Sequence, residues 1–428
     1  MSEQIETINS RRLPARLALV GAIIFALAFG WFAIRWQIGS MMAEMTSPTA
    51  GNARAIAETA HSLAPSNPMT NWLLASTETA ATTNGQIENS IEHFAQAVRL
   101  APNNFRWWLE LGRAYEQTNR SDAAEKAYLR AIELAPEYAF PRWQLGNFYL
   151  RQNRTDEAFS QLKKAASNNW TYRQQVFSIA WDFFEQDPAQ LEQITGDLPA
   201  VRAGLARFYA ARERAEDSLR IWNTLSEEEK RENQDVAKII AQALYEKRFY
   251  RSAIQFINQL GIENAKPETI QNGSFEEPIG KSGETYFGWK IAPPEKMDVK
   301  LDPTQKREGN RSLRVSFSGY SSPHLSDIYQ NIVTEPGKKY RLSFWLKTEN
   351  LKSAGTPLLE IVNTGDDKII TASKPFPTGT SDWQEIRLDF TMPENGESVS
   401  LRTTRAYCGD ACPIVGTFWY DDFKISRQ

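Results

Sequence analysis

Hydrophobic and polar positions follow two different periods along the chain, and the change between them falls near Ala265. Before this point, apolar residues recur three and four positions apart in alanine-rich stretches, which predicts amphipathic helices over 53–264. After it, short segments alternate apolar and polar residues between glycine- and proline-containing turns, which predicts β-strands over 265–428. The fold class expected is therefore multidomain α plus β.

A third pattern lies near the N-terminus. Leu17–Ile34 are eighteen residues without a charge. As a helix, this run is close in length to the ~30 Å hydrocarbon core of a bilayer. We predict a cytoplasmic tail over 1–16, a transmembrane helix over 17–36 and a juxtamembrane linker over 37–52.

The charges beside this run indicate its orientation. Three arginines lie just before it, and Arg35 alone follows closely. The positive-inside bias therefore places the N-terminus in the cytoplasm and the remainder across the membrane. A cleaved signal peptide is the alternative, but the bulky Trp31 and Phe32 at the end of the run favour an uncleaved anchor. We expect a single-pass inner-membrane protein with its bulk in the periplasm or outside the cell.

Within the helical part, the stretch "WWLELGRAYEQTNRSDAAEKAYLRAIELAP" (107–136) returns in outline 34 residues later, so that Gly112 recurs as Gly146. Such a period is typical of a solenoid of helical hairpins. Small residues such as Gly112 and Ala124 allow the two helices of a hairpin to approach closely, and aromatic residues fill the gaps. The unit resembles the tetratricopeptide repeat, and we expect five to six repeats over 53–264.

Solenoids of this kind usually hold protein partners in a concave groove, and we expect that role here. Most aromatic residues of the repeats fall on packing positions, so we assign them to the core. The formal net charge is −3, from 49 basic and 52 acidic residues, which gives no electrostatic footprint for nucleic acid. With only three histidines, a histidine-built metal site is not expected.

The strand-rich end predicts an antiparallel β-sandwich. The segments "NGSFEEP", "REGNRSLRVSF", "SDWQEIRLDFTMP" and a terminal "FWYDDFKIS" occur in that order over 269–428. The series resembles the carbohydrate-binding modules attached to bacterial cellulases and xylanases, which adopt a galactose-binding-like jelly roll. The resemblance implies that this part engages a polysaccharide.

Strand parity identifies residues that could contact a sugar. In "YRLSFWLK" (340–347), the alternate apolar side chains form the core face, and Trp345 shares the opposite, polar face with Arg341. Sugars stack on aromatic rings while flanking polar groups bond their hydroxyls. The alternative is that Trp345 packs under a loop or against the solenoid. The predicted carbohydrate-binding residues are Trp345, Arg341, Tyr420, Arg402 and Arg387.

The resemblance also implies a structural Ca²⁺ near the two ends of the module, with Glu276 and Asp422 as candidate oxygen ligands. Ordinary surface acids are the alternative for this pair. Cys408 and Cys412 in "CGDAC" are close enough to form a disulfide across one short loop, which an exported compartment permits. Because the spacing is not C-x-x-C, we expect a structural disulfide and not a reactive pair.

No nucleophile elbow, phosphate loop, zinc-helix motif or dinucleotide fingerprint occurs in the sequence. We therefore expect a non-enzymatic, membrane-anchored envelope scaffold that assembles or exports a surface polysaccharide, in a bacterium. Two alternatives stay open. One is a purely protein-docking scaffold whose sandwich binds no sugar. The other is a glycan-active protein of the hydrolase kind, which two opposed carboxylates in a cleft would favour.

Overall fold

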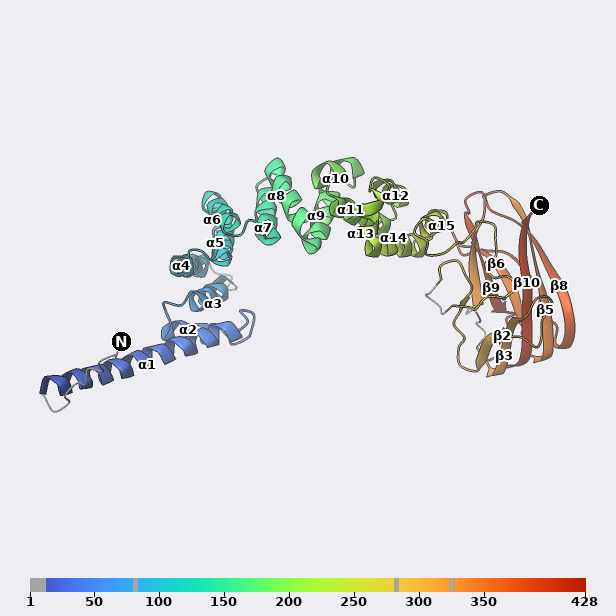
Figure 1. Cartoon of the computed structure of the whole chain (residues 1–428), viewed down its shortest axis with the longest axis horizontal. Coiled ribbons are helices and arrows are strands. Elements are labelled where there is room, and N and C mark those ends of the chain that lie inside the picture. The colour runs from blue at the N-terminus through green and yellow to red at the C-terminus, as the bar shows by residue number, and fades with distance from the viewer. Residues whose placement is uncertain (1–12, 80–83, 281–284, 323–324, 326–327) are drawn as a thin grey trace, which may run out of the picture. The chain divides into compact units, whose positions relative to one another are not determined.

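The computed structural model describes residues 13–79, 84–280, 285–322, 325 and 328–428. The chain divides into two compact units, 1–201 and 202–428, and each is described by itself. The helices of the first unit are α1 (Leu13–Met45), α2 (Ala53–Leu63), α3 (Pro68–Thr79), α4 (Asn84–Leu100), α5 (Phe105–Gln117), α6 (Ser121–Leu134), α7 (Ala139–Arg151), α8 (Thr155–Asn168), α9 (Trp170–Phe183) and α10 (Pro188–Thr195) (Figure 1). Helix α11 (Pro199–Ala211) crosses the boundary between the units.

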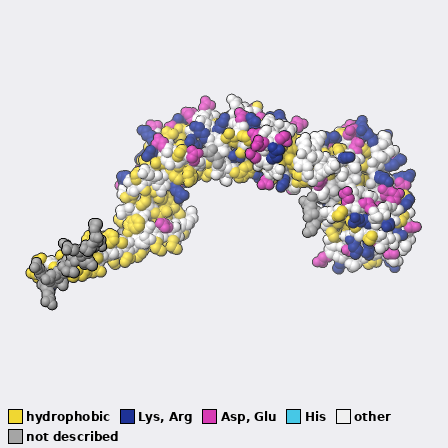
Figure 2. Space-filling view, viewed as in Figure 1, with side chains coloured by type: hydrophobic (Ala, Val, Ile, Leu, Met, Phe, Trp, Pro, Cys, Tyr) yellow, Lys and Arg dark blue, Asp and Glu magenta, His cyan; other side chains and the backbone are white. Residues whose placement is uncertain are grey.

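Helix α1 contains the apolar run and continues beyond it. Within the described residues, α1 is the helix that is long and apolar enough to cross a membrane, and hydrophobic side chains cover its visible surface (Figure 2). Residues 37–45, which we expected to form a linker, are its last turns. They are helical because they pack on α2, where a Cβ added to Gly39 would lie 2.7 Å from the carbonyl oxygen of Ala60.

The later helices of this unit pair into hairpins, as the repeat predicts. Gly112 on α5 lies against the ring of Tyr128 on α6, and a Cβ added there would lie 2.8 Å from Tyr128 Cε1. Gly146 on α7 makes the equivalent close approach to Leu162 on α8. Together with the fully buried Ala124, these contacts confirm that small residues set the spacing of the hairpin helices.

We expect Gly112→Val to destabilise the solenoid by about 2 kcal/mol, because the branched side chain must displace the buried ring of Tyr128. Thermal unfolding followed by circular dichroism measures the effect. Gly51→Ala is the matched control, since nothing lies within 4 Å of a Cβ at that position. Equal melting temperatures for the two variants would contradict the packing argument.

The second unit joins further helices to two antiparallel sheets. Its helices are α12 (Ala215–Trp222), α13 (Glu227–Glu232), α14 (Gln234–Glu246) and α15 (Tyr250–Gln259). Its strands are β1 (Lys290–Ile291), β2 (Met297–Asp302), β3 (Ser312–Tyr320), β4 (Ile328–Val333), β5 (Lys339–Lys352), β6 (Pro357–Asn363), β7 (Ile369–Ala372), β8 (Gly379–Thr391), β9 (Ser398–Arg405) and β10 (Ile414–Arg427).

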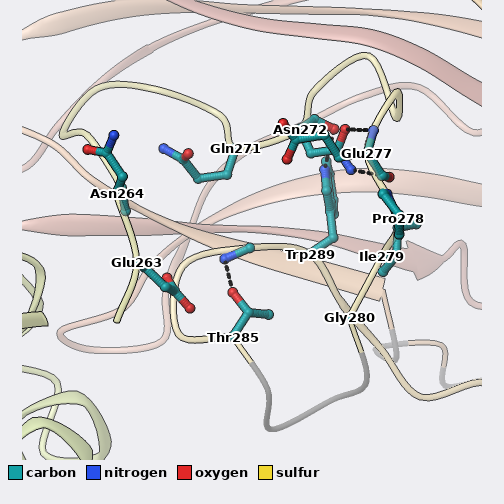
Figure 3. Close-up of a pocket in the computed structure, with 12 residues that line it drawn as sticks. Glu263, Asn264, Gln271, Asn272, Glu277, Pro278, Ile279, Gly280, Thr285 and Trp289 are labelled. Carbon is teal, nitrogen blue, oxygen red and sulfur yellow. Dashed lines mark hydrogen bonds between the residues drawn. The ribbon is translucent and has the colours of Figure 1, made fainter. Parts of the chain in front are cut away.

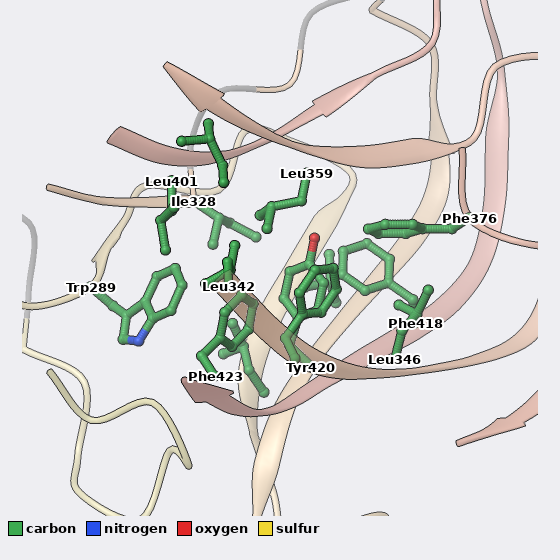
Figure 4. Close-up of a cluster of buried hydrophobic side chains, with 14 of the residues drawn as sticks. Trp289, Ile328, Leu342, Leu346, Leu359, Phe376, Leu401, Phe418, Tyr420 and Phe423 are labelled. Carbon is green, nitrogen blue, oxygen red and sulfur yellow. The ribbon is translucent and has the colours of Figure 1, made fainter. Parts of the chain in front are cut away.

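The strands form a β-sandwich, which confirms the predicted fold class. The first sheet has the order β1-β4-β9-β6-β7, and the second has the order β2-β3-β10-β5-β8. Alternate side chains of each strand face inward, so that Leu342 and Leu346 of β5 meet Leu359 of β6 and Leu401 of β9 in one buried cluster (Figure 4).

Strand β10 does not alternate regularly, and this overturns one prediction. Phe423 faces the core. If β10 alternated regularly, Tyr420, three residues earlier, would lie on the outer face of the sheet. The pairing of β10 with β5 shifts between Asp421 and Lys424, and Asp422 has a positive φ of 51°. This bulge inserts one residue and reverses the parity. Tyr420 is therefore fully buried in the core, and the prediction that it is exposed for sugar contact is wrong.

The last helical hairpin, α14–α15, packs on the first sheet. The Asn331 amide on β4 donates to the hydroxyls of Tyr245 and Tyr250, at 2.9 and 3.2 Å. On the same hairpin, Arg248 donates to the carbonyl oxygen of Thr364 at 2.6 Å. The buried Asn331 amide thus bonds two phenol oxygens in place of water, and these bonds fix the hairpin on the sandwich. We call these contacts the junction.

Candidate functional site

Three of the predicted carbohydrate-binding residues share the outer face of the second sheet. Trp345 and Arg341 lie on β5, and Arg387 lies on the neighbouring β8. Cross-strand pairing places Ser343 of β5 opposite Arg387. The parity argument therefore holds along the regular part of β5.

On this face the charges pair with one another. Arg341 donates to both carboxylate oxygens of Asp389 at 2.7 and 2.9 Å, which raises the pKa of the guanidinium. Arg387 pairs with Glu385. The guanidinium carbon of Arg307 lies 4.3 Å from the centroid of the Trp345 ring. A cation thus already occupies one face of the ring that we expected to stack on a sugar.

Arg402 lies elsewhere, and our placement of it beside Trp345 is wrong. It belongs to β9, a strand of the first sheet, so it projects from the opposite side of the sandwich. The reason is topological: strand order in a sandwich is set by long-range pairing, which alternation along one strand does not reveal.

Arg402 belongs to a row of side chains across the first sheet. Pairing between strands places Lys290 of β1 opposite Tyr329 of β4, Tyr329 opposite Arg402, and Arg402 opposite Glu360 of β6. The guanidinium donates to Glu360 Oε2 from Nε at 3.0 Å, and its Nη2 lies 2.9 Å from the same oxygen. Lys290, Tyr329, Arg402 and Glu360 are called the sheet row below.

The sheet row is recessed. The side chains of Glu360 and Arg402 are 13% and 33% exposed, whereas those of Asp389 and Arg341 on the second sheet are 63% and 43% exposed. Tyr329 is half-buried, and burial raises the pKa of its hydroxyl. An aromatic ring beside a sheltered carboxylate and guanidinium is the chemistry that holds a sugar.

The candidate calcium ligands Glu276 and Asp422 each bond other groups of the chain. Glu276 accepts hydrogen bonds from the backbone N–H groups of Asn310 and Arg311, which hold its pKa below the usual range, and Asp422 forms an ion pair with Lys424. No group of three or more His, Cys, Asp or Glu that could hold a metal occurs in the described part of the chain. Each of the two carboxylates keeps lone pairs for a cation, which would then draw most of its ligands from backbone carbonyls and water.

Cys408 and Cys412 are joined by a disulfide that closes the loop between β9 and β10. The buried Arg405 lies beside this loop and donates to the carbonyl oxygens of Ser322 and Gly355 at 2.6 and 3.0 Å. Burial lowers the pKa of this guanidinium. The loop therefore shelters a cation that is solvated by carbonyls, which fits a structural role.

The first unit contains an aromatic pocket of about 420 Å³ that sequence reasoning missed. Ring contacts connect Trp72 to Trp107, and Phe140 to both Trp143 and Tyr172. The repeat pattern assigns such rings to the core, yet all of them except the buried Trp107 are partly exposed where they line the cavity. The aromatic residues of the pocket are Trp72, Phe105, Trp107, Tyr138, Phe140 and Tyr172.

Comparison with known families agrees with both halves of the fold. Residues 267–406 match the family described as "Carbohydrate binding domain", and residues 79–139 match "Tetratricopeptide repeat". Among solved structures, "CBM4 structure and function" is similar at 19% identity with a TM-score of 0.27, over 37% of this chain and 99% of that one. "Crystal structure of MamA" is similar at 16% identity with a TM-score of 0.28, over 38% of this chain and 96% of that one.

Curated relatives match a short part of the chain. "Superkiller protein 3" of Saccharomyces cerevisiae is 38% identical over 55 residues, which are 13% of this chain and 4% of that protein. "Peroxisomal targeting signal receptor" of the same yeast is 35% identical over 63 residues, 15% of this chain and 10% of that protein. The chain thus spans a tenth or less of the length of these relatives.

Proposed function

For a chain that carries a tetratricopeptide-repeat region followed by a carbohydrate-binding domain, we propose a non-enzymatic scaffold that holds a glycan and a protein partner together at a membrane surface. The observation that carries this proposal is the sheet row, because its recessed Arg402–Glu360 pair lies beside the half-buried Tyr329. The outer face of the first sheet is thereby favoured over the Trp345 face as the glycan site.

The partner-binding half of the proposal rests on the aromatic pocket in the first unit. Rings that remain partly exposed attract apolar and aromatic side chains, which are the usual anchors of protein interfaces. We therefore propose a protein partner that inserts such side chains between Trp72 and Tyr172. A Tyr138→Glu and Tyr172→Glu double variant that captured the same partners as the parent chain would contradict this assignment.

The membrane part of the proposal rests on α1. The helix passes without a break from the apolar run into turns that pack on α2, so any cleavage site between the end of the run and Met45 would lie inside a helix. This favours a retained anchor over a cleaved signal sequence. With the arginines on its N-terminal side, the anchor places the bulk of the chain in the periplasm or outside the cell. Assembly or export of a surface polysaccharide in a bacterial envelope is the role we propose.

Glycan binding is tested by an array of polysaccharides probed with the full chain in a detergent without a sugar headgroup. Saturable binding to one polysaccharide class, with the polymer recovered at its original length, is the expected result. Failure to bind any polysaccharide would overturn the glycan half of the proposal and leave a protein-docking scaffold. Shortening of the polymer would instead favour the hydrolytic alternative.

We also propose a structural Ca²⁺ at Glu276 and Asp422. Because an ion that binds only the folded state stabilises it by mass action, Ca²⁺ at a hundred times its Kd should add about 2.7 kcal/mol to the free energy of unfolding. Differential scanning calorimetry of the full chain in Ca²⁺ and in EDTA measures the shift, with Glu276→Gln as the variant that should lose it. Identical curves in the two buffers would contradict the proposal.

A further inference from the structure

A second cavity lies in the second unit, and no residue of the sheet row lines it, although Lys290 of the row directly follows the lining residue Trp289. Its volume is about 420 Å³, within the range of small-molecule sites. One side comes from the segment after α15 and the other from the segment that leads to β1, as Figure 3 shows. The side chains that matter here are those of Glu263, Asn264, Gln271, Glu277, Thr285 and Trp289. We call this cavity the junction pocket.

The first side of the junction pocket is held by contacts to both the solenoid and the sandwich. The Glu263 carboxylate accepts the backbone N–H groups of Tyr286 and Phe287. The rings of these two residues pack on Tyr245 of α14, with centroids 5.4 and 5.5 Å apart. The buried Gln330 donates to the carbonyl oxygen of Gln271 and accepts its N–H, both at 2.9 Å. This side is therefore fixed before any ligand arrives.

The opposite side is fixed by Asn272. Its side-chain amide donates to the carbonyl oxygen of Glu277 at 2.8 Å and accepts the N–H of Glu277 at 3.0 Å (Figure 3). The indole N–H of the buried Trp289 donates to the carbonyl oxygen of Asn272 at 3.3 Å. Hydrogen bonds between the two segments thus hold the walls of the pocket in place, and such pre-organisation lowers the cost of binding.

Several polar groups of the pocket remain unused. The side-chain amides of Asn264 and Gln271 and the carboxylate of Glu277 make no hydrogen bond with any described residue. Amides donate and accept at once, and carboxylates accept from paired hydroxyls, so together they suit a ligand with many hydroxyl groups. No lysine or arginine occurs among the described residues that line the pocket, whereas two carboxylates do.

From this lining we infer that the junction pocket binds one or two sugar units that are neutral or carry an amino group, and that it excludes acidic sugars. The inference rests on the proposed function in taking a carbohydrate as the ligand, and it adds a second site with its own charge preference. An amino sugar gains attraction chiefly from Glu277, because Glu263 already accepts two backbone N–H groups and interacts with the Lys290 ammonium, whereas a uronic acid meets these carboxylates as like charges. The glycan site of this chain would then include residues contributed by the end of the solenoid.

The test uses the full chain in a detergent without a sugar headgroup and three disaccharides: cellobiose, the β-1,4 dimer of glucosamine, and digalacturonate. Saturation-transfer NMR titrations give the affinity of each. We expect the first two to bind, the glucosamine dimer more tightly, and digalacturonate not to bind. Gln271→Ala should weaken both ligands at least about tenfold, since one amide that bonds sugar hydroxyls is lost. Glu277→Gln should remove the preference for the amine.

Two controls separate this pocket from the sheet row. Lys300→Ala removes an exposed ion pair with Asp298 on β2 that neither lines the pocket nor belongs to the junction, and it should leave the disaccharide affinities unchanged. Tyr329→Ala alters the sheet row, and Tyr329 does not line the pocket. Disaccharide binding that is lost in Tyr329→Ala and kept in Gln271→Ala would overturn the pocket and leave the proposed function standing. If the chain binds no polysaccharide but its disaccharide binding depends on Gln271, the pocket stands as a sugar site and the sheet row is overturned as the polysaccharide site. No binding of any disaccharide, or equal binding of digalacturonate, would overturn the pocket.

Discussion

Replacing Tyr329 by alanine should weaken polysaccharide binding roughly ten- to a hundredfold, because one aromatic surface that a sugar covers is worth about 1.5–3 kcal/mol. The ring lies directly opposite Arg402 on the neighbouring strand, so both contact the same stretch of a glycan laid across the first sheet. Affinity electrophoresis in gels that contain the bound polysaccharide measures the change.

Trp345→Ala on the second sheet is the matched control. The Trp345 ring is covered on one face by Arg307, and its neighbours Arg341 and Arg387 are neutralised by carboxylates. We therefore expect less than a twofold change in affinity. The reverse outcome, with binding lost in Trp345→Ala and kept in Tyr329→Ala, would return the glycan site to the face that strand alternation alone favours.

A second variant protects this test against misfolding. Removing Arg402 leaves the recessed Glu360 without its partner, which destabilises the sheet as well as the site. Glu360→Gln keeps the shape and the hydrogen bond to Arg402 but removes the charge. Affinity should fall in this variant while the melting temperature changes little. If affinity is lost only in variants whose sheet unfolds, the Arg402–Glu360 pair has a structural role and does not bind the glycan.

The repeat architecture could be predicted from the sequence because its determinants are local. Gly112 and Tyr128 lie within one hairpin, so their spacing along the chain carries the packing information. The aromatic pocket was missed for a related reason. The repeat motif uses Trp108, which is partly buried and donates its indole N–H to the carbonyl oxygen of Pro102 at 2.8 Å, whereas its neighbour Trp107 is buried in the core and also lines the cavity. A motif identifies the packing ring and says nothing of the ring beside it.

The candidate glycan site was only partly predictable, for two physical reasons. Alternation is reliable while a strand is regular, as along β5, and fails where the bulge at Asp422 inserts a residue. Sheet membership depends on pairing between distant strands, so Arg402 could not be placed from β9 alone. A usable signal did exist in "IYQNIV" (328–333), where Ile328 and Ile332 face inward and therefore turn Tyr329 outward. The recess around Glu360, by contrast, arises from tertiary packing.

Tyr245→Ala should produce the largest change in stability, because it empties the centre of the junction. The buried ring contacts Tyr250, Tyr286 and Phe287, with centroids 5.0, 5.4 and 5.5 Å away, and its hydroxyl accepts the Asn331 amide. Truncation of a buried aromatic residue to alanine costs about 3–5 kcal/mol. We expect the free energy of unfolding of the second unit to fall by that amount, and calorimetry of the full chain measures the change. Tyr138→Ala, on an exposed ring of the first unit, is the control that should leave stability nearly unchanged.

The same variant should separate the last hairpin from the sandwich. Asn331 would keep only the hydroxyl of Tyr250, and the rings of Tyr286 and Phe287 would lose the surface that positions their backbone for Glu263. Hydrogen exchange should therefore rise both in α14–α15 and at residues 285–289. A Tyr245→Ala and Asn331→Ala double variant should lose less than the sum of the single losses, since the two residues share one interaction. Additive losses with unchanged exchange at 285–289 would show that the hairpin and the sandwich fold independently. In that event the solenoid could not fix the wall of the junction pocket, and the pocket would belong to the sandwich alone.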